Sequence, residues 1–132
     1  MRTELEMVRE FHRVYRCFLQ AQPTGGIPER EWLVRARLMQ EELDEYREAA
    51  AAGDLVGIAD ALSDLLYVVL GTYLAHGLQD VAEDLFREVH SSNMSKLDSS
   101  GQPLYREDGK VLKSELFRAP DLRSILERGQ KE

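Results

Sequence analysis

The stretch of sequence that decides the fold reads EELDE at 41–45, AAAAGD at 49–54 and IADALSDLLYV at 58–68. Strong helix formers fill both sides of Gly53, a residue type that commonly ends helices, and Asp54 is placed to cap a following helix. The sequence therefore predicts one helix from about Glu29 to Ala52 and a second from Leu55 to about His76, joined by a short turn at Gly53.

Acidic residues recur at helical spacing on both predicted helices. Glu41, Glu42 and Glu45 are one, three and four residues apart, which places them on one helical face. Asp60 and Asp64 repeat the spacing of four and are the only carboxylates between positions 55 and 78. In an antiparallel hairpin, residues whose numbers sum to about 105 face each other. Both acid groups then lie about eight residues, or roughly 12 Å, from the turn.

These carboxylates need a cation. The window from 41 to 64 holds eight acids and a single base, Arg47, so its charge equals that of the whole chain, −7. An ionised carboxylate in an apolar helix is costly unless it is neutralised, and all-oxygen ligation favours Mg²⁺ or Mn²⁺. A Glu-rich helix face by itself is more often simply solvated. Asp60 and Asp64, inside an apolar segment, shift the interpretation to a metal site.

Composition limits the class of protein. A chain of 132 residues with 43% hydrophobic and 31% charged residues is typical of a single soluble domain. Its negative charge makes a nucleic-acid polymer or an anionic membrane surface a poor partner. The single cysteine, Cys17, cannot form an internal disulfide, which favours the cytoplasm. We find no run of about 18 apolar residues and no apolar signal core, so no membrane span is expected.

Two further helices complete the predicted core. Apolar residues at helical spacing predict a first helix of about five turns that ends near Gln22. A fourth helix is expected to begin at Asp80 with a capping box and to carry inward Val81, Leu85, Val89 and Met94. The expected fold is all-α, with a four-helix core over about residues 1–97. A C-terminal arm over about 98–132 is expected to hold a small hairpin, from 104–105 and 111–112, and a short helix within 120–127.

The chemistry suggested by these residues is hydrolysis of a phosphoanhydride. A hard dication held by carboxylates suits hydrolysis of phosphoanhydrides, and the chain lacks the Glu-x-x-His motifs of di-iron bundles. The two acidic segments, with EVHSSNMSK at 88–96 and YREDGK at 105–110, resemble the MazG-like all-α nucleoside triphosphate pyrophosphohydrolases. These relatives include phosphoribosyl-ATP pyrophosphohydrolase and the helical dUTP and dCTP pyrophosphatases. The resemblance implies Mg²⁺-dependent cleavage between the α and β phosphorus atoms.

The resemblance also implies roles for the acids. Glu41, Glu45 and Asp64 correspond to metal ligands, and Glu42 is our candidate for the carboxylate that handles the attacking water. The family's downstream motif reads Glu-x-x-Asp, whereas Ala61 stands three residues before Asp64 here. Asp60 lies one residue earlier on the same face and is the candidate to replace the missing acid.

Five further residues are candidates for binding the substrate. In the resembling family the end of the fourth helix faces the nucleotide, which gives Asn93 and Lys96. Because a concentrated negative site needs cations to admit an anionic substrate, Arg106 and Lys110 of the arm are candidates to close over the polyphosphate, from the same or a neighbouring subunit. The only tryptophan, Trp32, is a candidate to stack on a base. The alternatives are ordinary helix-end chemistry, isolated surface charges and, for Trp32, a core or dimer contact.

Self-association is expected because the third helix is apolar nearly all round, and the resemblance implies a homodimer or a dimer of dimers. The predicted function is hydrolysis of a (deoxy)nucleoside triphosphate to the monophosphate and pyrophosphate, as house-cleaning of the cytoplasmic nucleotide pool. One alternative is phosphoribosyl-ATP pyrophosphohydrolase. The other is a non-catalytic acidic helical module that binds a metal or a protein partner.

Overall fold

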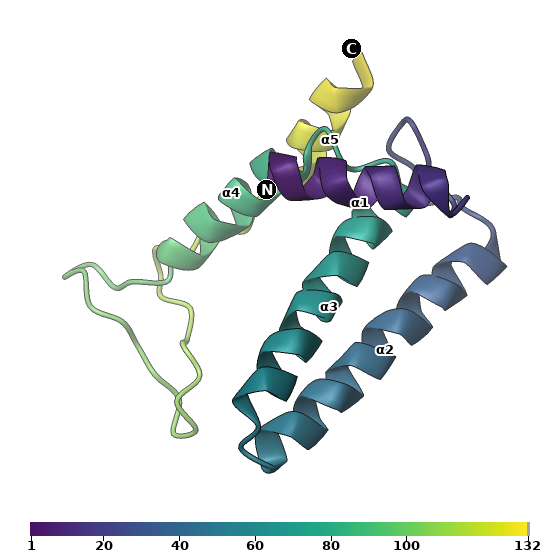
Figure 1. Ribbon diagram of the computed structural model, residues 1–132. Coiled ribbons are helices and arrows are strands. Elements are labelled where there is room, and N and C mark those ends of the chain that lie inside the picture. Colours follow the sequence, from purple (N-terminus) through teal and green to yellow (C-terminus); the bar gives the residue numbers. More distant parts are fainter. Residues whose placement is uncertain (132) are drawn as a thin grey trace. The chain divides into compact units, whose positions relative to one another are not determined.

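The structure is a computed structural model that describes the backbone of residues 1–131 and the side chains of residues 1–128. This part of the chain contains the helices α1 (Arg2–Val14), α2 (Glu29–Ala51), α3 (Leu55–Ala75), α4 (Ala82–Met94) and α5 (Leu122–Lys131) (Figure 1). It forms no extended strand, so the predicted all-α class is confirmed. The chain divides into two compact units, residues 1–80 and the segment from Val81 onward, which are described separately.

The first unit is organised around the α2–α3 hairpin. The two helices lie side by side and are joined at Gly53, whose φ of +64° is a left-handed conformation that glycine adopts without steric cost (Figure 1). The side chain of Asp54 accepts a hydrogen bond from the amide of Gly57 at 3.1 Å and so caps α3 as predicted. Both predicted helices and their turn are therefore confirmed to within about a residue.

The core of the first unit lies at the C-terminal end of α3, where α1 packs against it. Its buried residues are aliphatic: Leu5, Val8, Leu70, Leu74 and Ala75. This packing fixes the end of α3 that lies far from the turn. The turn end of the hairpin depends on the contact between α2 and α3.

The predicted extent of α1 is wrong, because the helix ends at Val14 rather than near Gln22. Arg16 has a φ of +57°, and the amide of Cys17 donates to the carbonyl of His12 at 2.8 Å, the pattern of a Schellman ending. The chain then runs along the end of α3, where the amide of Gln20 donates to the carbonyl of Leu74. Apolar residues of this loop continue the helical spacing by coincidence, which is why periodicity overextended the helix.

In the second unit, α4 begins later than predicted. Val81 stands at the N-cap, and Asp80 provides no side-chain cap. Val81 and Leu85 are buried as expected, whereas Val89 and Met94 are exposed, so their predicted inward orientation is wrong. The exposed pair lies on the second half of α4, beyond the turns that bury Leu85.

The arm is tied to α4 by hydrogen bonds. Ser92 Oγ donates to the carbonyl of Arg118 at 2.8 Å, and the Arg118 guanidinium pairs with Glu88. The predicted hairpin is reduced to one antiparallel bridge, Tyr105 with Val111. The predicted short helix is present as α5, which contributes the buried Ile125.

Contrary to the sequence expectation, α3 is long and apolar enough to cross a membrane by length and composition alone. A count of unbroken apolar residues missed this because Asp60 and Asp64 interrupt the helix, whereas its average hydropathy is high. The helix leaves apolar side chains exposed, and Leu55 and Val56 are 76% and 80% exposed.

Candidate metal centre

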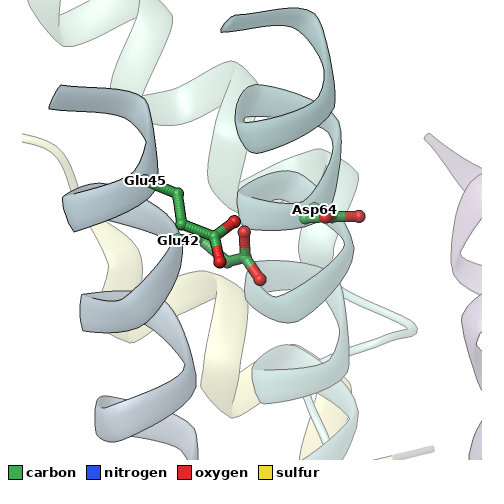
Figure 2. A group of neighbouring side chains, drawn as sticks. All are labelled: Glu42, Glu45 and Asp64. Carbon is green, nitrogen blue, oxygen red and sulfur yellow. The ribbon is translucent and has the colours of Figure 1, made fainter. Parts of the chain in front are cut away.

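Three carboxylates converge between α2 and α3. One oxygen from each of Glu42, Glu45 and Asp64 lies within 4.8 Å of the others. Figure 2 shows Glu42 and Glu45 on one helix and Asp64 on the facing one. Glu42 and Asp64 each lie eleven residues from Gly53, so the antiparallel register expected from the sequence is the one observed.

Glu42 has the most unusual environment of the three. Its Oε2 atom is buried and has no hydrogen-bond partner. Burial is the main cause that raises the pKa of Glu42, and the neighbouring carboxylates Glu45, Asp64 and Asp60 raise it further. When ionised, this carboxylate therefore carries an uncompensated negative charge.

The three carboxylates, hereafter the acidic triad, fit a divalent cation. Among the described residues, none of the three forms an ion pair with a basic side chain. Carboxylate oxygens are the ligands preferred by hard dications such as Mg²⁺ and Mn²⁺. The buried Oε2 atom of Glu42 has no hydrogen-bond partner and is free to bind such an ion. The triad can therefore hold a divalent metal ion.

The other two predicted ligands lie outside the triad. Glu41 is exposed on α2. Asp60 is exposed one turn from Asp64 and lines, with Glu45, an open cavity of about 330 Å³ beside the hairpin turn. The roles of Glu41 and Asp60 as metal ligands stay predictions.

The predicted substrate-binding residues are divided between the two units. Trp32 lies exposed on the first turn of α2. Asn93 is exposed near the end of α4 and Lys96 follows that helix, while Arg106 and Lys110 lie in the bridged hairpin, where Arg106 pairs with an aspartate two residues on. The contribution of all five to a substrate site stays a prediction.

Sequence analysis overlooked two polar residues in the first unit. His12 of α1 and Arg35 of α2 are only 2% and 9% exposed. The signal for Arg35 was present, because it lies seven residues before Glu42 and so shares its helical face. No local pattern indicated that His12 of α1 would lie beside Arg35.

An all-helical fold with carboxylates gathered between two antiparallel helices is consistent with a helical pyrophosphohydrolase. The family model described as phosphoribosyl-ATP pyrophosphohydrolase matches residues 8–93, and the chain belongs to this family. The matched segment contains the whole acidic triad. The resemblance noted from the sequence is thereby confirmed.

A solved structure extends the likeness over the full chain. The chain is 26% identical to a protein of Exiguobacterium sp. 255-15 to which NTP pyrophosphohydrolase activity is ascribed. The likeness covers 97% of this chain and 96% of the other, with a TM-score of 0.55. A search of curated protein sequences gave no significant match. The chain belongs to a family of pyrophosphohydrolases, and a single helix of this length and composition is weak evidence for a membrane span.

Proposed function

We propose that this protein hydrolyses a nucleoside or deoxynucleoside triphosphate at the α–β phosphoanhydride with Mg²⁺ and releases the monophosphate and pyrophosphate. The acidic triad, with the buried and unpartnered Oε2 of Glu42, is the observation that carries the proposal. The activity ascribed to the similar Exiguobacterium protein supports a nucleoside triphosphate as substrate. The corresponding role is house-cleaning of the cytoplasmic nucleotide pool.

In this proposal Glu45 and Asp64 hold the metal, with Glu41 and Asp60 as further candidate ligands. A Mg²⁺ ion bound there would neutralise phosphate charge and orient the phosphate oxygens. Glu42 orients the attacking water and takes its proton while a new bond forms to the α phosphorus and the bond to the bridging oxygen breaks. Because burial already raises the pKa of Glu42, its carboxylate is a better proton acceptor than an exposed glutamate.

Cations are required around the leaving group, since the triad itself repels an anionic substrate. Lys96, Arg106 and Lys110 are proposed to neutralise the polyphosphate and Asn93 to donate to the sugar or phosphate. Trp32 is proposed to stack on the base.

The second candidate is phosphoribosyl-ATP pyrophosphohydrolase, which the matched family model itself favours. The bond cleaved is the same, so only the choice of substrate separates the two activities. A non-catalytic acidic module is the remaining alternative.

The test is product analysis with Mg²⁺ across canonical nucleoside triphosphates, deoxynucleoside triphosphates and phosphoribosyl-ATP, with pyrophosphate and orthophosphate measured separately. We expect pyrophosphate from a subset of the triphosphates and none from Asp64→Asn. Asp44→Asn is the matched control, because Asp44 is exposed on α2 and bonded to Gln40. Orthophosphate as the first product, or turnover by Asp64→Asn at the parent rate, contradicts the proposal.

We also propose that the protein works as a homodimer or a dimer of dimers. The support is the apolar surface that α3 leaves exposed, which includes Leu62 and Leu66 in addition to Leu55 and Val56. Light scattering after size exclusion is expected to give at least twice the monomer mass, and Leu66→Glu to lower it. A parent protein that is monomeric at micromolar concentration refutes this proposal.

A further inference from the structure

Arg35 is a buried cation without a hydrogen-bond or ion-pair partner among the described residues. Its Nε atom is covered and unbonded, and in the described part of the chain Arg35 makes neither a hydrogen bond nor an ion pair. Glu31, one turn earlier, pairs with Arg30 at 3.5 Å and acts on Arg35 only as a nearby charge, without an ion pair. A guanidinium remains charged and carries five N–H donors, so leaving it buried and unpaired is costly. An acceptor from outside the described contacts is needed.

His12 presents the complementary group. Its Nδ1 lies 3.1 Å from the carbonyl oxygen of Phe18, so this nitrogen must carry the proton and donate. Burial is the main cause that lowers the pKa of His12; the bond to Phe18 opposes this shift and Arg35 adds to it, so the neutral ring is favoured. The other nitrogen, Nε2, is consequently an acceptor, and the described residues supply no donor to it.

The donor of Arg35 and the acceptor of His12 meet over Gly71 of α3. A Cβ atom added at Gly71 would lie 2.8 Å from His12 Nε2 and 3.1 Å from a terminal nitrogen of Arg35. Only glycine leaves these two groups the space they occupy. Three helices thus bring one donor and one acceptor to the same point.

This point lies on the same line as the acidic triad. Arg35 precedes Glu42 by seven residues and Gly71 follows Asp64 by seven, so each helix places its pair on one face about two turns, or roughly 10 Å, apart. That separation suits the distance from the α-phosphate to the far edge of the base in an extended nucleotide. A nucleotide with its α-phosphate at the triad would carry its base to Arg35.

Exposed aromatic rings lie on α3 and at the C-terminal end of α1. Tyr67 of α3 lies between Asp64 and Gly71 in sequence and packs edge-on to Phe11, with ring centroids 5.6 Å apart. Tyr15 continues this surface, with its ring centroid 4.5 Å from that of Phe11. Such rings provide an apolar surface on which a base can stack.

We propose that Arg35 and His12 are specificity-determining residues that read a lactam edge of the substrate's base, an inference that rests on the proposed function. Arg35 donates to a ring carbonyl oxygen, and His12 Nε2 accepts from the adjacent ring N–H. Uracil, thymine, guanine and hypoxanthine offer this edge. Adenine has no carbonyl, and cytosine has no ring N–H beside its carbonyl, so adenine substrates, phosphoribosyl-ATP included, are disfavoured.

The experiment compares kcat/KM for dUTP with dCTP and for dGTP with dATP, because each pair keeps the ring size and changes the edge. We expect the parent protein to prefer the lactam member of at least one pair by about tenfold or more, since a site built for hydrogen bonds rejects an analogue that lacks them. Arg35→Met is expected to remove the preference mainly through KM of the lactam substrate. Arg37→Met, at an exposed position of the same helix, is the matched control and should keep it.

The outcomes separate the two levels of the proposal. No pyrophosphate from any triphosphate with the parent protein refutes the proposed function itself. Turnover with equal kcat/KM within both pairs, or a preference that survives in Arg35→Met, overturns the base-reading role alone. Arg35→Lys, which keeps the charge but loses the planar fork, should also weaken the preference and serves if the methionine variant does not fold. A purely structural Arg35 would lower Tm and slow all four substrates equally.

Discussion

The two units of this protein treat their charges in opposite ways. In the second unit the Arg118 guanidinium pairs with Glu88 and donates to Ser91 Oγ at 2.7 Å, so this cation is satisfied within the arm and α4. In the first unit the buried Oε2 of Glu42 and Nε of Arg35 have no partner. The paired charges fasten the arm, whereas the unpaired ones remain available to a ligand.

The separation of Glu42 from Arg35 within the first unit is more informative than the difference between the two units. Glu42 and Arg35 carry opposite charges on one face of α2, yet two helical turns keep them from neutralising each other. A sequence selected only for stability would pair or remove buried charges. A nucleotide with a metal ion at one end and a base at the other would satisfy both sites.

The largest expected effect is on catalysis. Glu42→Gln should lower pyrophosphate release by on the order of 10²–10⁴, the usual loss for a general base. The metal-free variant should also melt at a higher temperature, because repulsion within the acidic triad is relieved. Pyrophosphate assays and calorimetry measure the two effects. Activity equal to that of Asp44→Asn would show that the triad is not the catalytic centre.

Metal binding should be visible without substrate. Because only the folded hairpin brings the triad together, Mg²⁺ at about 100 times its Kd should stabilise the fold by roughly 2.7 kcal/mol. Thermal unfolding with and without chelator measures this difference. Asp64→Asn should reduce the increase in Tm, and a parent protein whose Tm ignores Mg²⁺ and Mn²⁺ would contradict the metal site.

Where His12 and Arg35 approach α3, Gly71→Ala should destabilise the protein by about 1–3 kcal/mol, the usual cost of overpacking. The added methyl would meet the His12 ring, which its hydrogen bond to Phe18 holds in place. Urea unfolding measures the change. Gly25→Ala is the control, because nothing lies within 4 Å of a Cβ there. Equal effects of the two substitutions would mean that His12 and Arg35 move aside without cost.

In metal-free protein, the contributions of Glu42 and His12 to the free energy of unfolding should respond to pH with opposite signs. The pKa of Glu42 is raised, so its favourable contribution is present below pH 4.5 and is lost as pH rises through its folded pKa. The pKa of His12 is lowered, so its contribution is present above pH 6.5 and is lost as pH falls through its folded pKa.

Unfolding free energies over a pH series, with chelator present, test both signs. Relative to the parent, Glu42→Gln should gain stability as pH rises above 4.5, and His12→Asn should gain stability as pH falls below 6.5. Asparagine retains a donor for the Phe18 carbonyl and does not titrate. Parallel pH profiles for the parent and either variant would contradict the corresponding assignment.

The smallest effect is expected in the second unit. Glu88→Gln removes the charge that pairs with Arg118 in an exposed setting, where salt screens the interaction. A slight fall in Tm at low ionic strength should disappear at high ionic strength, with kcat unchanged. A fall in Tm that persists in high salt would show that this pair is not an ordinary surface ion pair.

Local sequence placed Glu42, Glu45 and Asp64 close together because this geometry depends on short-range rules, whereas Glu41 and Asp60, expected at the same point, lie outside the triad. The turn at Gly53 and the spacing of 3.6 residues per turn place Glu42 opposite Asp64 once the two helices are antiparallel. The errors arose where local and tertiary signals compete. The apolar residues after Val14 belong to a loop on α3 rather than to α1, and Asp80 is displaced as cap by Val81.

The sequence by itself determined the helices, the hairpin register and the concentration of acids on one face. Only the tertiary structure decided that Oε2 of Glu42 and Nε of Arg35 are buried without hydrogen-bond partners and that His12 reaches Gly71. The physical reason is the distance along the chain over which the two kinds of interaction act. Helical periodicity fixes which side chains share a face, whereas burial depends on which distant helix covers that face. The helices α1 and α3, which pack together, are more than forty residues apart in the chain.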